Sequence, residues 1–140
     1  MPNINFYNQE IKTIIPHKRK LKVYLEKLVI SEKHSIESLS IILCTDAFIK
    51  SMNQKYLGHD YETDILTFEL SIVQKRIEGE LYISIDTVKN NASSLHVVFM
   101  NELLRVIFHG VLHLCGYKDS NDKEAALIRE KEDFYLSNYT

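Results

Sequence analysis

The chain has 140 residues, a length that fits one domain with a core of its own. Apolar residues make up 45% of it and charged residues 26%, a balance that excludes a disordered chain. The net charge of −2 gives no overall attraction to nucleic acid, although it permits a local basic surface. No apolar run approaches the roughly 20 residues of a membrane span, and residues 1–12 lack the apolar core of a signal peptide. We therefore expect a cytoplasmic protein with no membrane segment.

The first half of the chain alternates between predicted strands and helices. Residues 4–7 are typical of a short strand, and apolar side chains recur at helical spacing from Pro16 onwards. Residues 38–44 are apolar and β-branched, which predicts a buried strand. Thr45 is the expected N-cap of a helix that Gly58 would end.

Two further strands are predicted over residues 63–70 and 79–85. Residues 77–79 lie between them, so we expect the two strands to pair as neighbours.

The second half is predicted to be mainly helical. Asp86 is expected to cap a short helix that runs to about Ala92. A long helix should begin near Leu95 and end at Gly116 in a left-handed conformation. A last helix should start at about Asn121. The side chains expected to bury this last helix are Leu127, Ile128, Phe134 and Tyr135.

This order of elements predicts an α+β fold in which residues 1–140 form one domain. We expect a small mixed β-sheet of about four strands packed with about five helices, and a metal site on the long helix in the C-terminal half. Cys44 and Cys115 both lie in apolar runs, so they are expected to be buried free thiols.

The segment most informative about chemistry is residues 109–119. His109 and His113 are one helical turn apart, so their rings lie one above the other and can converge on one cation. Gly116 lets the chain turn back, and Asp119 follows as an oxygen ligand. A histidine pair at this spacing also occurs on ordinary helix surfaces, but the glycine and the acid favour a metal site. Three protein ligands leave a position for water, as in catalytic sites.

The same segment fits the zinc-protease pattern H-E-x-x-H-x-x-G-x-x-H, with Asp119 in the last place. Gly110, however, stands where those proteases carry the glutamate that acts as general base. A metallopeptidase-like hydrolase therefore stays an alternative without its usual proton acceptor.

Three blocks of the sequence resemble the YbeY family of metal-dependent endoribonucleases. Residues 109–119 are similar to the family signature H-G-x-L-H-L-x-G-Y-D-H, residues 53–68 to N-x-x-Y-R-G-x-D-x-P-T-D-V-L-S-F, and residues 79–84 to G-D-I-x-I-S. The resemblance implies cleavage of single-stranded RNA, with roles in maturing the 3′ end of small-subunit ribosomal RNA and in ribosome quality control. The implied partners are ribosomal RNA and the small ribosomal subunit; the oligomeric state stays open.

The resemblance also implies one Zn²⁺ ion per chain, because His109, His113 and Asp119 fall on the family's metal-ligand positions. We assign catalysis to the same three residues. The family usually has histidine where Asp119 stands, and a carboxylate makes Mn²⁺ or another divalent ion a possible alternative.

Leu57 stands where the family has an arginine that is thought to serve catalysis or phosphate binding. Its replacement gives weight to another alternative, a non-catalytic ribosome-assembly factor with a structural metal. The candidates for substrate binding are Lys55, His59, Asp64, Arg105 and Lys118. The alternative for Lys55, His59, Arg105 and Lys118 is an ordinary surface position, and the alternative for Asp64 is a strand-end cap. Glu102, on the same helix as His109, is expected to form a structural ion pair with Arg105. The basic run at residues 17–22 either guides RNA or is a solvated helix face.

Overall fold

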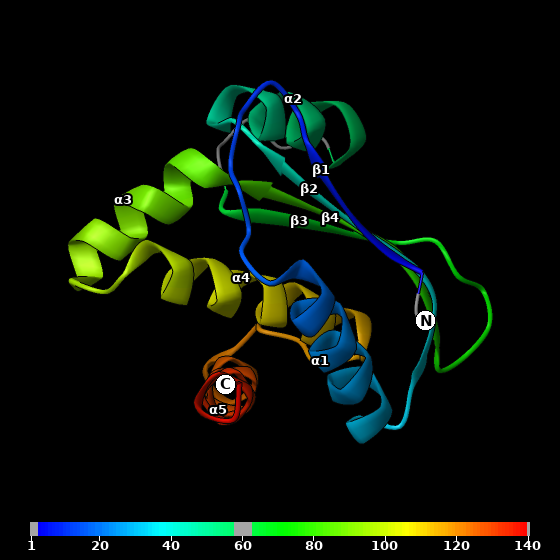
Figure 1. Ribbon diagram of the computed structural model, residues 1–140. Coiled ribbons are helices and arrows are strands. Elements are labelled where there is room, and N and C mark those ends of the chain that lie inside the picture. The colour runs from blue at the N-terminus through cyan, green and yellow to red at the C-terminus, as the bar shows by residue number, and fades with distance from the viewer. Residues whose placement is uncertain (1–2, 58–62, 140) are drawn as a thin grey trace.

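A computed structural model describes residues 3–57 and 63–139 as a four-stranded mixed sheet covered by helices, shown in Figure 1. The strands are β1 (Ile4–Asn8), β2 (Ser35–Cys44), β3 (Ile65–Glu69) and β4 (Arg76–Ser84). The helices are α1 (Lys18–Ser31), α2 (Asp46–Leu57), α3 (Ile85–Leu95), α4 (Phe99–Leu114) and α5 (Asp122–Ser137). The predicted α+β class, with four strands and five helices in the described ranges, is confirmed.

The strands lie in the order β1-β2-β4-β3. β1 pairs with β2 and β2 with β4, both in parallel, whereas β3 runs antiparallel to β4. The expected pairing of the third and fourth strands is therefore confirmed. Residues 77–79 do not connect these two strands, however, because they belong to β4 itself. The loop between β3 and β4 is correspondingly shorter than the loop between the two predicted strands.

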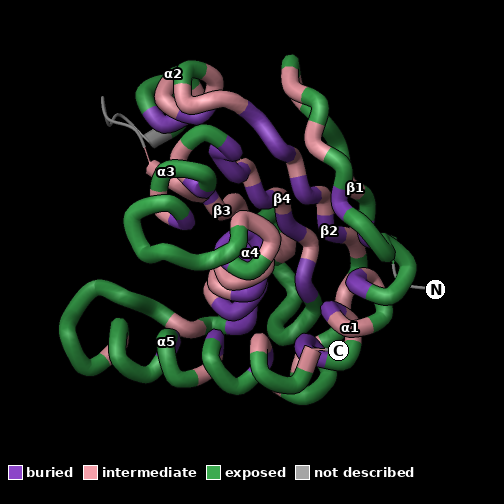
Figure 2. Tube along the Cα trace, turned by 60° about the vertical axis from the view of Figure 1, so that its left-hand side comes forward, coloured by how far each residue is buried: buried purple, intermediate pink, exposed green. Residues whose placement is uncertain are grey.

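The main core lies between one face of the sheet and helices α1 and α4. Leu39 and Ile41 on β2 and Leu81 and Ile83 on β4 alternate with less buried neighbours and face this core. α2 covers the opposite face with a smaller apolar cluster around Ile49. Figure 2 shows the buried segments gathered on the sheet and on α4, which packs against the sheet.

Several predicted boundaries are wrong around α3. Ser84, not Asp86, caps the helix: its hydroxyl accepts a hydrogen bond from the Thr87 amide at 3.2 Å. Ile85 is consequently the first helical residue rather than the last residue of the strand.

The long helix also begins later than predicted. α3 continues to Leu95 and ends at His96, which has left-handed backbone angles (φ 57°). The chain then turns, and α4 starts at Phe99 instead of Leu95. The break between the two helices was predicted, but it lies at residues 96–98 rather than between Ala92 and Leu95.

The ends of the other helices follow local side-chain chemistry. The Thr45 hydroxyl accepts a hydrogen bond from the Phe48 amide at 3.1 Å, as expected for an N-cap. Asn121 caps α5 by accepting from the Glu124 amide at 2.9 Å. Gly116 has the predicted left-handed conformation, with φ 103°. Gly58 lies outside the described residues.

α5 buries fewer apolar side chains than predicted. Leu127 and Phe134 are 48% and 55% exposed, so they do not bury the helix. The buried stripe consists of Ile128, Glu132 and Tyr135. The middle member of that stripe is a carboxylate, which needs a partner inside the protein.

Cys44 and Cys115 are buried free thiols, as expected. No single helix of the described chain is long and apolar enough to cross a membrane; only α3 and α4 taken together pass that test, and they are bent by 119°.

Candidate metal centre

The C-terminal end of α4 brings three potential metal ligands together. His109 and His113 project from successive turns, and Asp119 comes from the loop that follows Gly116. The two Nε2 atoms are 2.9 Å apart, and the Asp119 Oδ2 atom lies 3.4 Å from the first and 3.6 Å from the second. A tetrahedral ion with bonds of about 2.0–2.1 Å places its ligand atoms about 3.3 Å apart. These three atoms are therefore spaced as ligands of one ion would be.

Hydrogen bonds fix which nitrogen of each ring carries hydrogen. The Nδ1 atom of His113 lies 2.9 Å from the Tyr117 carbonyl oxygen, and that of His109 lies 2.5 Å from the Glu132 carboxylate. A carbonyl and a carboxylate only accept, so both Nδ1 atoms act as donors. In the neutral rings, the lone pairs on both Nε2 atoms then face each other and the Asp119 oxygen. A proton satisfies two of these three acceptors, whereas a metal ion satisfies all three.

Glu132 is the main support of this arrangement, and the sequence analysis missed it. Its side chain is only 5% exposed, and its other oxygen accepts from Arg105 Nη1 at 3.0 Å. Burial lowers the pKa of His109, but the hydrogen bond and charge of Glu132, with the charge of Asp119, raise it overall above the usual value. A carboxylate behind a metal-binding histidine is a common way to orient the ring. The available signal was a glutamate on the apolar stripe of α5.

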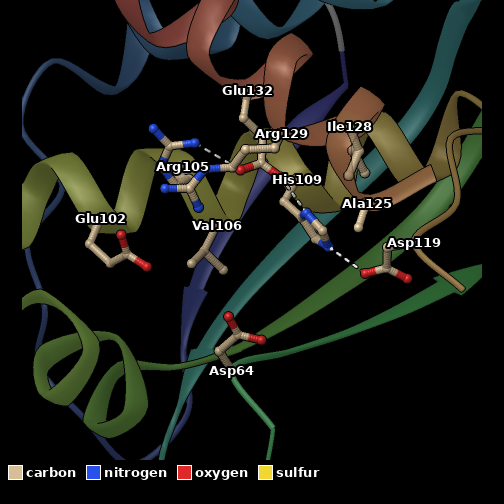
Figure 3. Close-up of a pocket in the computed structure, with 10 residues that line it drawn as sticks. All are labelled: Asp64, Glu102, Arg105, Val106, His109, Asp119, Ala125, Ile128, Arg129 and Glu132. Carbon is tan, nitrogen blue, oxygen red and sulfur yellow. Dashed lines mark hydrogen bonds and ion pairs between the residues drawn. The ribbon is translucent and has the colours of Figure 1, made fainter. Parts of the chain in front are cut away.

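Two adjoining cavities open beside the three ligand atoms. The first, of about 290 Å³, lies between α4 and α5 and is shown in Figure 3. The second, of about 420 Å³, lies along β3. Asp64, His109 and Asp119 line both cavities. A substrate that enters either cavity thus reaches the same cluster of side chains.

Two predicted substrate-binding residues, Asp64 and Arg105, line the first cavity. Burial raises the pKa of Asp64, although the nearby His109 lowers it in part. Arg105 forms ion pairs with Glu132 and, at 2.7 Å, with Asp133. The expected ion pair with Glu102 is not among the ion pairs of the described residues. The charge of Arg105 is therefore largely compensated within the protein.

Two other predicted substrate-binding residues, Lys55 and Lys118, do not line these two cavities. Lys55 is exposed on α2, with its Nζ atom 5.2 Å from the centre of the Tyr56 ring. Lys118 is exposed beside a different cavity, which Tyr117 also lines. His59 lies outside the described residues.

Arg129 is a cation of the first cavity that the sequence analysis did not single out. It is exposed on α5, and it takes part in none of the ion pairs found among residues 3–57 and 63–139. An exposed arginine on a helix has no distinguishing signal in sequence. Its position becomes informative only once α5 is packed against α4.

The fold and the site together define a small α+β protein with a candidate three-ligand metal centre at the end of a buried helix. The centre is open to cavities that carry both acidic and basic groups. The chain belongs to the YbeY family: the family model described as Endoribonuclease YbeY matches residues 3–140.

Individual relatives agree with this assignment over nearly the whole chain. A protein named Endoribonuclease YbeY from Cytophaga hutchinsonii is 42% identical over 134 residues, which cover 96% of this chain and 94% of the relative. Its namesake from Amoebophilus asiaticus is 38% identical, covering 96% and 91%. The solution structure of TM1509 from Thermotoga maritima is similar with a TM-score of 0.66 and 32% identity, covering 96% of this chain and 87% of that one.

Proposed function

We propose that residues 1–140 act as one metal-dependent endoribonuclease domain that cleaves single-stranded RNA. The chain is a member of a family whose relatives carry the name endoribonuclease. The metal dependence is inferred from three potential ligand atoms, His109 Nε2, His113 Nε2 and Asp119 Oδ2, which lie within 3.6 Å of one another. We further propose that it acts in the cytoplasm on ribosomal RNA of the small subunit, in 3′-end maturation and quality control.

In this proposal His109, His113 and Asp119 hold one Zn²⁺ ion, with Mn²⁺ as the alternative that a carboxylate ligand favours. A bound ion of this kind lowers the pKa of its water and polarises a phosphoryl oxygen. Glu132 keeps the His109 ring oriented through its hydrogen bond at Nδ1.

The remaining chemical tasks fall to residues that line the first cavity. Asp64 accepts the proton that the attacking water loses, since its carboxylate shares the cavity wall with His109. Arg129 binds the phosphate, because it is exposed there and forms no ion pair with another residue that the structure describes. Arg105, which two carboxylates neutralise, contributes mainly to holding Glu132.

The two alternatives are not favoured. A glutamate at position 110, as in the zinc proteases, would displace side chains of the sheet, because its Cβ atom would lie 2.6 Å from Ile65 Cδ1. A structural metal in a non-catalytic assembly factor would not need an open cavity beside its ligands. The relatives named as endoribonucleases also favour RNA cleavage over both alternatives.

The decisive experiment compares His113→Ala with a control that removes an imidazole elsewhere. His96→Asn is suitable because His96 is exposed and asparagine tolerates its left-handed backbone. We expect His113→Ala to lose both bound zinc, by elemental analysis, and cleavage of a single-stranded RNA. His96→Asn should retain both. Full RNA cleavage by metal-free His113→Ala would refute the proposal.

A further inference from the structure

A basic groove lies at the junction of α1 and the end of α5, away from the ligand cluster. It encloses about 650 Å³, and its lining, within the described chain, contains no carboxylate. Its lining residues are His17, Arg19, Lys20, Val23, Tyr24, Lys27, Asn138 and Tyr139. Figure 2 shows the C-terminal end of α5 beside α1.

The positive charge of the groove is concentrated on α1. α1 carries five lysine and arginine side chains and a single carboxylate, Glu26, although the whole chain has a net charge of −2. Arg19, Lys20 and Lys27 are exposed, and no ion pair of the described residues includes them. Positive charge gathered this way on an otherwise acidic protein favours an anionic partner.

The floor of the groove is aromatic and held in place. The Tyr24 hydroxyl donates to the Tyr135 carbonyl oxygen at 2.6 Å, and the Tyr24 and Tyr139 ring centres are 4.9 Å apart. Both rings also contact the buried Phe108. Lys20 lies over the Tyr139 ring, with Nζ 4.9 Å from its centre. Rigid rings beside cations are the combination that single-stranded nucleic acids bind.

The spacing of the cations suits a polyanion better than a single small anion. Lys20 and Lys27 are seven residues apart on one helix, which places them about 10 Å apart along its axis. A nucleic acid strand carries a phosphate every few ångströms, so one strand in the groove meets both lysines. We propose that this groove binds the backbone of single-stranded RNA, an inference that rests on the proposed endoribonuclease function.

The groove lies at the C-terminal end of α5, whereas the first cavity beside the metal centre lies next to residues 125–132 of the same helix. Tyr135 and Tyr139 face α1, whereas Glu132 and Arg129 face α4 and the first cavity. The groove is therefore a second contact for RNA that is long enough to pass around the end of α5. It adds affinity for long strands and gives little to short ones.

The test is RNA binding by the double variant Lys20→Gln/Lys27→Gln. Binding is followed by fluorescence anisotropy in excess chelator, so that no cleavage occurs. We expect the variant to bind a strand of about 20 nucleotides more weakly than wild type does, and to lose less affinity for a strand of about five nucleotides. If two phosphate contacts disappear, wild type should lose about sevenfold more affinity than the variant between 50 and 200 mM salt. Lys33→Gln/Lys89→Gln, which changes two exposed lysines outside the groove, is the control.

The outcomes separate this inference from the proposed function. Unchanged binding and salt dependence in the groove variant would overturn the inference, whereas the endoribonuclease proposal would stand if wild type still cleaves RNA with metal. The selective loss supports the inference even where no cleavage is detected. Vesicles of phosphatidylserine provide the last comparison: a loss of vesicle binding without a loss of RNA binding would assign the groove to membranes and overturn it.

Discussion

Replacing Glu132 by glutamine tests how the metal centre depends on its buried support. The Glu132 carboxylate accepts from His109 Nδ1 at 2.5 Å and from Arg105 Nη1 at 3.0 Å, and glutamine keeps its shape. A glutamine has only one accepting oxygen, so its NH₂ group must face one of these two donors. Outer contacts of this kind are worth about 10–100-fold in metal affinity, or about 1.4–2.7 kcal/mol. We expect zinc binding to weaken by that factor.

The assay is a competition titration of zinc against a chromophoric chelator, with RNA cleavage measured in parallel. Asp133→Asn is the matched control because Asp133 pairs with the same Arg105 but is 60% exposed and contacts neither histidine. Its zinc affinity should stay within about twofold of wild type, since exposed ion pairs contribute little. Equal zinc affinities in wild type and Glu132→Gln would refute the reasoning, as would equal losses in the two variants.

Three further changes follow from particular contacts. Gly110→Ala should lower the melting temperature. Alanine gains about 1 kcal/mol in helix propensity, but its Cβ would lie 2.6 Å from a side-chain carbon on β3, and such overpacking costs about 1–3 kcal/mol. A higher melting temperature would contradict this expectation. Burial raises the pKa of Glu32, but hydrogen bonds from Tyr135 and Tyr117 outweigh it, so the pKa falls below its ordinary 4.5. Glu32 therefore contributes stability that is present above its unfolded pKa and lost as the pH falls through the lower folded pKa; Glu32→Gln should flatten that acid loss in denaturant titrations, and an unchanged slope would count against it. Arg129→Gln should lower kcat/KM for RNA about tenfold or more while bound zinc stays constant, because a charge-assisted phosphate contact is worth about 1.5–3 kcal/mol. An unchanged kcat/KM would show that Arg129 does not bind the substrate.

The parts of the site that sequence could predict are those set within one turn or one loop. His109 and His113 are four residues apart on a helix, and Gly116 redirects the chain toward Asp119, so their meeting follows from helical geometry. Their role as ligands stays a prediction. Glu132 is 23 residues from His109 and belongs to another helix. Its contact depends on how α5 packs against α4, which no local pattern encodes.

The same distinction applies to the fold. The β3–β4 pair was predictable because the two strands are close in sequence. The parallel pairing of β2 with β4 depends on a crossover through α2 and β3 that apolar periodicity does not reveal. The break between α3 and α4 was predicted a few residues too early because His96, a residue without obvious turn preference here, adopts the left-handed conformation that ends α3.

Gly110 links the packing of the fold to the chemistry of its site. At this position α4 lies so close to the sheet that a Cβ atom would meet Ile65 Cδ1 at 2.6 Å and Leu81 Cδ2 at 2.9 Å. That close approach brings the start of β3 beside the ligand cluster, and Asp64, one residue before Ile65, forms part of the cavity wall opposite α4, as Figure 3 shows. In the zinc-protease pattern the helix itself supplies the catalytic carboxylate. Here the helix carries no side chain at that position where the sheet approaches, and in the proposed mechanism the carboxylate comes from Asp64, directly before β3, instead.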